Sequence, residues 1–138
     1  MSTQWVPATL RAEVRRHAAG RCEFCLVHED DVGAPHEPDH IIAEQHGGRT
    51  TVENLAFACY HCNRHKGTNL ASIDPETAKP EFLFHPRRQK WADHFRIEGP
   101  LVIALTPTGR ATVALLKFNE PERVESRRLL ILAGRFPV

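Results

Sequence analysis

Four cysteines form two matched pairs, Cys22-Glu-Phe-Cys25 and Cys59-Tyr-His-Cys62. Zn²⁺ binds four thiolates in a tetrahedron, and two short Cys-x-x-Cys turns can present them from two directions. Paired cysteines of this kind are more often metal ligands than disulfides in a reducing compartment. The pattern therefore predicts a structural zinc site. Four thiolates leave no open coordination position, so the chemistry must be sought elsewhere.

The 33 residues between Cys25 and Cys59 contain the adjacent pair Asp39-His40. A carboxylate oxygen is a ligand that Mg²⁺ prefers, and an imidazole with an ordinary pKa near 6.5 is suited to act as a general base at neutral pH. If the backbone bends at the start of a strand, the pair can place the carboxylate on a cation and the imidazole beside an attacking water. This insert is long enough to house such an element.

A series of short motifs follows the same order as in a known family. The motifs are Pro38-Asp-His-Ile-Ile, Gly47-Gly, Glu53-Asn-Leu and Cys59-x-x-Cys-Asn-x-x-Lys-Gly67. Over residues 21–68 the chain resembles the HNH endonucleases with a ββα-metal (His-Me) fold, in the subgroup stabilised by four cysteines. A less specific resemblance, to the C-terminal extension of a bacterial HNH subgroup, covers Leu83-Phe-His-Pro-Arg-x-x-x-Trp91-x-x-His-Phe95 and Leu105-Thr-Pro-x-Gly-Arg-Ala-Thr-Val113.

The resemblance assigns roles by position. It implies that His40 is the general base that activates water, and that Asp39 and Asn63 hold a divalent cation. Asn54 would hold the loop between the two strands by side-chain hydrogen bonds and so orient His40. The cation would stabilise charge on the phosphate and on the leaving 3′ oxygen.

One position departs from the family. Colicin-type HNH nucleases place a further metal-binding histidine four residues after the position of Asn63, and here that residue is Gly67. The catalytic cation would then have two protein ligands, both of them oxygens. Such a site favours Mg²⁺ or Mn²⁺ over Zn²⁺ or Ni²⁺. Asn63 also has a simpler interpretation, because an asparagine directly after Cys62 can cap the N-terminus of a helix.

The expected fold is α+β: a ββα-metal finger clamped by a four-cysteine zinc site, with an N-terminal helix and a C-terminal β/α extension. The whole chain, 1–138, is predicted to be a single HNH nuclease domain, with its core at about 21–68 and its extension at about 80–138. Hydrophobic periodicity and turn residues predict helices, strands and one linker. The helices are expected at 7–20, 59–68, from Thr108 onward and from 119 onward, the strands at 40–42, 55–58 and 101–105, and the linker at 72–80. Phe82, Phe84, Trp91 and Phe95 are expected to be core aromatics.

Charge is distributed unevenly along a chain whose net charge is +1. Residues 1–58 carry four more acidic than basic side chains, and residues 59–138 carry five more basic than acidic ones. This asymmetry suits a half that faces phosphates, although a solvated basic surface has the same composition. The candidate DNA contacts are Arg64, Lys66, Arg87 and Arg88.

Composition also limits the class of protein. No apolar run approaches the length of a membrane span, and the N-terminal residues lack the pattern of a signal peptide. We therefore expect a cytoplasmic protein that binds DNA and no membrane, as a monomer or a weak dimer. One ββα unit holds one catalytic centre, so one monomer should cut one strand at a time, as a nickase does.

Two other classes of function remain. A non-catalytic, zinc-ribbon-like module that binds nucleic acid would use the same cysteines and the same basic half, but it would not require Asp39, His40 and Asn63 together. A thiol redox protein is disfavoured by the two matched cysteine pairs and by the lack of a βαβ context.

Overall fold

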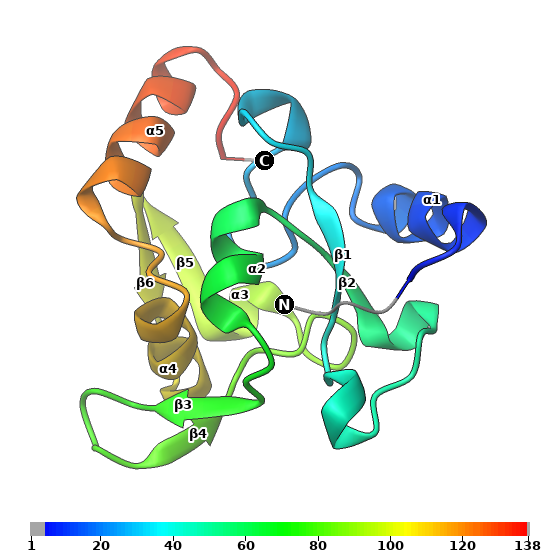
Figure 1. The fold of residues 1–138 in the computed structure, drawn as a ribbon. Helices are drawn as coiled ribbons and strands as arrows, with labels where there is room; N and C mark the ends of the chain where they lie inside the picture. The colour runs from blue at the N-terminus through cyan, green and yellow to red at the C-terminus, as the bar shows by residue number, and fades with distance from the viewer. Residues whose placement is uncertain (1–4, 138) are drawn as a thin grey trace.

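The computed structural model describes residues 5–137, which form an α+β structure with three antiparallel two-stranded sheets (Figure 1). The α-helices are α1 (Ala8–His17), α2 (Tyr60–Lys66), α3 (Trp91–His94), α4 (Pro107–Leu115) and α5 (Pro121–Leu132). The strands are β1 (Glu37–His40), β2 (Leu55–Ala58), β3 (Ala71–Ile73), β4 (Pro80–Phe82), β5 (Phe95–Glu98) and β6 (Leu101–Ala104). Short 3₁₀ helices occupy η1 (Glu29–Asp31), η2 (Glu44–His46) and η3 (Val52–Asn54).

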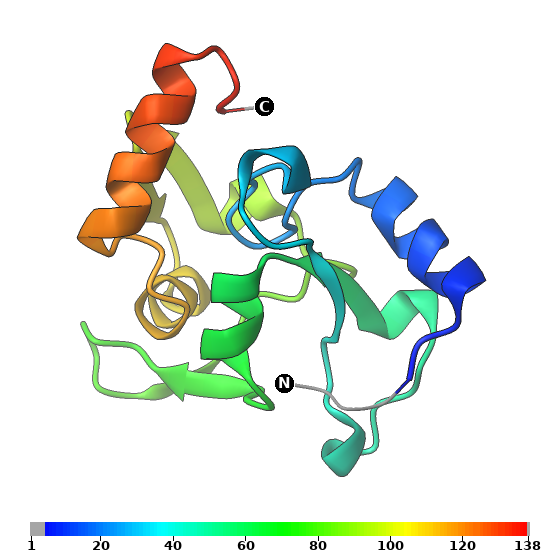
Figure 2. The ribbon, with the colours of Figure 1, turned by 45° about the horizontal axis from the view of Figure 1, so that its top comes forward.

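The centre of the molecule is a ββα unit made of β1, β2 and α2. The two strands pair antiparallel, with Asp39 opposite Ala56 and His40 opposite Leu55. α2 begins two residues after β2 ends and packs against β1. α1 packs on the hairpin from the other side, as both ribbon views show (Figures 1 and 2). The hairpin is therefore held between two helices.

The predicted strand at 40–42 is wrong in its position, because β1 ends at His40. Beyond His40, one backbone hydrogen bond joins the Ile41 nitrogen to the Asn54 carbonyl. The backbone of Ile42 is then bound by the side chain of Asn54 instead of by a strand. The ladder stops where this side chain replaces the neighbouring backbone. The strand at 55–58 and the helix after Cys59 are confirmed.

The main hydrophobic core joins the region of the four cysteines to the C-terminal extension. Phe95 packs against Phe84 and Phe118, with ring centroids 5.3 Å and 5.8 Å away. The same cluster of buried residues contains all four cysteines. A smaller cluster under α1 contains Val6, Val14, Leu55 and Phe57. The region of the four cysteines and the extension thus share one core.

Several predictions for the C-terminal half need correction. The expected linker at 72–80 lies largely in the β3–β4 hairpin, and Phe82, expected in the core, is 73% exposed at its edge. α4 begins at Pro107 and not at Thr108, and its N-cap is Thr106, whose hydroxyl accepts a hydrogen bond from the Gly109 nitrogen. Proline at the first turn of α4 explains the shift, since proline favours the first helical position. None of the helices in the described part of the chain has the length and apolar character needed to cross a bilayer.

A buried ion pair fixes the β3–β4 hairpin to α4. The Arg110 guanidinium donates to both oxygens of Asp74, at 2.8 to 3.1 Å. Hydrogen bonding from Arg110 holds the pKa of Asp74 at about 2, below its ordinary 3.8. A carboxyl whose pKa is lower in the folded state stabilises that state above the unfolded pKa, and the effect is lost as the pH falls through the folded pKa. The pair should therefore contribute fully throughout the neutral range.

We expect Asp74→Asn to lower the urea midpoint of unfolding, because Arg110 loses its buried carboxylate and keeps only the exposed one of Glu76. The difference from wild type should be constant between about pH 8 and pH 5, since both pKa values of Asp74 lie below that range. Asp93→Asn is the control, because Asp93 is exposed on α3. A difference that shrinks within this range would show that the ion pair does not set the pKa of Asp74.

Candidate active site and metal centre

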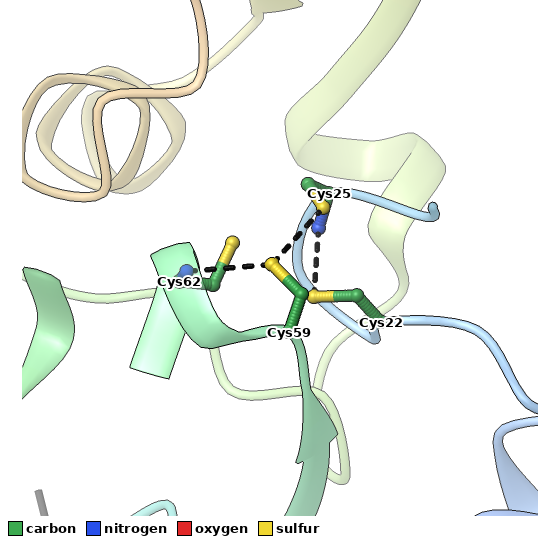
Figure 3. Close-up of side chains that lie close together, drawn as sticks. All are labelled: Cys22, Cys25, Cys59 and Cys62. Carbon is green, nitrogen blue, oxygen red and sulfur yellow. Dashed lines mark hydrogen bonds between the residues drawn. The ribbon is translucent and has the colours of Figure 1, made fainter. Parts of the chain in front are cut away.

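The four cysteines converge on one buried point, two from the loop after α1 and two from the start of α2 (Figure 3). Their sulfur atoms all lie within 4.8 Å of one another, and the Cys25 and Cys59 sulfurs are 3.7 Å apart. A tetrahedron with Zn–S bonds of about 2.3 Å has sulfur–sulfur edges of about 3.8 Å. The cluster therefore has the size of a zinc site.

Each Cys-x-x-Cys turn is closed by a backbone hydrogen bond to its first sulfur. The Cys25 nitrogen donates to the Cys22 sulfur and the Cys62 nitrogen donates to the Cys59 sulfur, both at 3.4 Å. The second of these bonds makes Cys59 the N-cap of α2. The interpretation of Asn63 as the cap is therefore wrong, because Asn63 lies inside the helix.

The thiols of the cluster strongly affect one another. Burial raises the pKa of Cys22 and of Cys62 well above the ordinary thiol value. Hydrogen bonds from the neighbouring cysteines lower the pKa of Cys25. A bound metal ion would replace the thiol protons and stabilise all four cysteines as thiolates, since thiolate is the metal-binding form.

Arg123 of α5 lies against the thiolates from the side of the C-terminal extension. The Nη2 of Arg123 donates to the Cys62 sulfur at 3.2 Å, and its Nη1 donates to the Leu116 carbonyl at 2.6 Å. Burial alone would lower the pKa of Arg123, but the charges on Cys62, Cys25 and Cys59 outweigh it and raise this pKa above its usual value. The guanidinium therefore stays charged and offsets part of the negative charge of a metal held by four thiolates.

Asp39 lies on β1 and is 1% exposed. Its Oδ2 is 3.0 Å from the Lys66 ammonium, which is 2% exposed and donates its hydrogen bond to the His40 carbonyl at 3.0 Å. Within the described residues neither carboxylate oxygen has a well-aligned hydrogen-bond donor. Burial raises the pKa of Asp39, and Lys66 opposes that rise. The charge of the carboxylate is thus balanced by Lys66, but its oxygens still lack hydrogen-bond donors.

His40 is 1% exposed, and its two ring nitrogens differ in their surroundings. Nε2 is 3.0 Å from the hydroxyl oxygen of Thr50, whereas Nδ1 is buried and has no partner among the described residues. Burial lowers the pKa of His40 below its ordinary 6.5, against the opposing charge of Asp39. The ring is therefore neutral at neutral pH, and Nδ1 is free to accept a proton if Nε2 carries the hydrogen.

Asn63 presents a second buried oxygen without a partner. Its Oδ1 is buried and bonded to no atom of residues 5–137. Asn63 and Lys66 are three residues apart on α2, so they lie on the same face of the helix, and the Lys66 ammonium reaches Asp39. The face of α2 that carries Asn63 therefore faces the strand that carries Asp39.

Asn54 makes the hydrogen bonds expected of a residue that shapes the loop between the strands. Its Oδ1 accepts from the Ile42 nitrogen, and its Nδ2 donates to the carbonyls of Ile42 and Arg49, all at 2.8 to 2.9 Å. Gly48 lies so close that an added Cβ would be 1.7 Å from the Ile42 carbonyl oxygen. Only glycine fits there, so Gly48 and Asn54 together fix the turn that follows His40.

The predicted DNA contacts divide into two groups. Arg64 and Arg88 are exposed, and a phosphate contact by either stays a prediction. Lys66 and Arg87 need correction, because both are engaged inside the protein. Arg87 pairs with Glu23 and donates to backbone carbonyls of residues 52 and 55, and Lys66 is held at Asp39. Their charges are used to fasten the fold.

Sequence reasoning missed three residues of these sites. Thr50 had no signal beyond its place in a polar loop. Lys66 was noted only as a cation, although its place three residues after Asn63 puts both on one helix face. Arg123 is 61 residues from Cys62 along the chain, and only the docking of α5 brings them together.

Comparison with protein families gives one match: residues 22–69 fit the model described as HNH endonuclease. The matched segment covers both cysteine pairs, β1, β2 and α2. Comparison with curated proteins and with solved structures gave no match.

We expect the purified protein to hold about one zinc ion per chain and Cys62→Ser to lose it and unfold, since structural zinc supplies folding energy. Arg123→Met should keep the fold but weaken zinc binding about 10- to 100-fold, as loss of groups that bond to ligands typically does. Transfer of zinc to a chelating dye measures this. Arg128→Met, on the exposed face of the same helix, is the control. Equal transfer from Arg123→Met and wild type would contradict a role for Arg123 at the metal.

Proposed function

We propose that the chain is a metal-dependent DNA endonuclease or nickase, because residues 22–69 match the family model described as HNH endonuclease. It hydrolyses phosphodiester bonds, with His40 as general base and a divalent cation, Mg²⁺ or Mn²⁺, held by Asp39 and Asn63. The four cysteines hold a structural zinc ion and take no part in the reaction. A single ββα unit cuts one strand per event.

One observation carries this proposal: buried polar atoms without partners gather on the residues that the family pattern singles out. Four of the five such atoms in residues 5–137 are both oxygens of Asp39, Nδ1 of His40 and Oδ1 of Asn63, and the fifth is Nδ1 of His36. Buried polar groups in folded proteins nearly always have partners, so exceptions need an explanation. The oxygens of Asp39 and Asn63 are suited to a hard cation such as Mg²⁺. A bound cation and a reacting water would satisfy this group of atoms.

The protein's own part in the reaction is positioning and proton transfer. Thr50 lies 3.0 Å from Nε2 of His40. In the tautomer that donates Nε2–H to Thr50, Nδ1 is unprotonated and able to take the proton of the attacking water. Asn54 and Gly48 fix the turn behind the imidazole. When bound, the cation would stabilise negative charge on the phosphate and on the leaving oxygen.

The alternative is a nucleic-acid-binding module without catalysis, and one observation favours it. Lys66 already balances the charge of Asp39, with 3.0 Å between the ammonium and the carboxylate. In a nuclease Lys66 would limit the affinity for the cation without replacing it, because the second carboxylate oxygen and Asn63 remain available. Cation binding therefore distinguishes the two functions.

His40→Ala should lower the nicking of supercoiled plasmid in Mg²⁺ or Mn²⁺ by about 10²- to 10⁴-fold, the usual contribution of a general base. The fold should survive, and unchanged zinc content and circular dichroism would show it. His46→Ala, an exposed histidine of η2, should cut as well as wild type. If His40→Ala nicks at the wild-type rate, His40 is not the base.

Calorimetric titration with Mn²⁺ should show one site in the zinc-loaded protein. Asp39→Asn and Asn63→Ala should each weaken that site at least about tenfold, because each removes one of two protein ligands. Asp93→Asn should leave it unchanged. Wild-type protein that binds DNA but no Mn²⁺ would support the non-catalytic alternative instead.

A further inference from the structure

A cavity lies directly beside the proposed catalytic site. It has a volume of about 300 Å³ and opens between the end of β1, the end of α2 and residues 82–89. Lys66 lines it, and the same ammonium is 3.0 Å from Asp39. Ile41 and Ile42, the two residues after His40, form another part of its wall. The cavity therefore begins one side chain away from the place where the phosphate would be cut.

The wall of this cavity combines apolar surface with positive charge. Its apolar part comes from Ile41, Ile42, Leu70, Phe82, Leu83 and Phe84, and no carboxylate lines it. Arg88 lies at its edge, exposed, and forms no ion pair within residues 5–137. An occupant with an apolar face and a nearby negative charge would fit both features.

Hydrogen-bond donors in the wall are also available. The Nδ1 of His85 accepts from the backbone nitrogens of Arg87 and Arg88, both at 3.2 Å, so the hydrogen of the neutral ring is on Nε2. Burial lowers the pKa of His85, which keeps that ring neutral. The Oε1 of Gln89 accepts a hydrogen bond from the backbone nitrogen of His85, which leaves the side-chain amide hydrogens of Gln89 as donors. A ligand that carries carbonyl or ring-nitrogen acceptors would satisfy these groups.

Phe82 is the most unusual residue of the wall, because it is a large aromatic side chain left 73% exposed. It is the last residue of β4 and belongs to neither hydrophobic core. Exposed aromatic rings beside cationic side chains are the usual platform on which unpaired bases stack. Phe82 and Arg88 lie on the same cavity and together supply such a platform.

We propose that this cavity binds one unpaired nucleobase of the DNA strand next to the cut, with the base against Phe82 and its phosphate at Arg88. The proposal rests on the proposed function and narrows its substrate: DNA with an unpaired or flipped nucleotide beside the scissile phosphate is favoured over continuous duplex. The base is held by stacking and by the donors of His85 and Gln89. The cavity thus selects DNA structure and does not contribute to the cutting itself.

The test compares two labelled duplexes of one sequence, one fully paired and one with a single unpaired thymine. Fluorescence anisotropy measures binding in the His40→Ala background, so that the DNA is not cut during the measurement. The unpaired thymine should strengthen binding at least about fivefold, the low end of base stacking on an aromatic ring. Phe82→Ala should remove that preference and keep most of the binding to paired duplex. Arg88→Gln should also remove the preference, and it should weaken binding to both duplexes because a phosphate contact is lost.

Matched controls are available on α5. Leu132 is also 73% exposed, and Arg128 is an exposed arginine, so Leu132→Ala and Arg128→Gln should keep the preference. Equal binding of the two duplexes, or a preference that survives both Phe82→Ala and Arg88→Gln, would overturn the proposal.

Plasmid nicking by the protein with His40 intact distinguishes failure of the base-binding proposal from failure of the nuclease proposal. Nicking without a preference for the unpaired thymine would support the nuclease and contradict the base-binding cavity. A preference for the unpaired thymine without nicking in Mg²⁺ or Mn²⁺ would support the cavity and contradict the nuclease.

Discussion

Two short turns that are distant in the sequence have to bring four sulfurs to one buried point, and the rest of the structure is arranged around that requirement. The first turn follows α1 and the second begins α2, so closing the cluster fixes both helices relative to the β1–β2 hairpin. Four buried thiols repel one another once they lose their protons, and only a cation compensates for that charge. Arg123 then extends the same electrostatic unit into the C-terminal extension through its bond to Cys62.

A second buried charge lies at the other end of α2, one turn beyond Cys62. Asp39 is balanced by Lys66 from the same helix that carries Cys62 and Asn63. A carboxylate buried in this way is stable only with a cation beside it. In the proposed nuclease, adjacent residues of α2 therefore serve two metal sites: Cys62 supplies sulfur to the structural one, and Asn63 supplies an oxygen to the catalytic one. A structural metal at the cysteines would therefore also position Asn63 for the proposed reaction.

The expectations from sequence were most accurate where one local motif carries its own geometry. The cysteine turns, the strand at 55–58 and the helix after Cys59 follow directly from spacing and residue type. The expectations failed where a contact between distant segments determines the local structure. β1 ends at His40 because the Asn54 side chain takes over the Ile42 backbone, and the expected linker folds into a hairpin that Arg110 fastens through Asp74.

The sequence by itself determined the types of side chain available: four thiolates that can hold one metal, and a carboxylate, an imidazole and an amide for the proposed chemistry. Only the tertiary structure decided which charges are free to act. It placed Lys66 and Arg87 inside, against Asp39 and Glu23, and left Arg88 and Phe82 outside on one cavity. The physical reason is that a side chain's charge is local to its residue, whereas its burial and its partners depend on segments far along the chain.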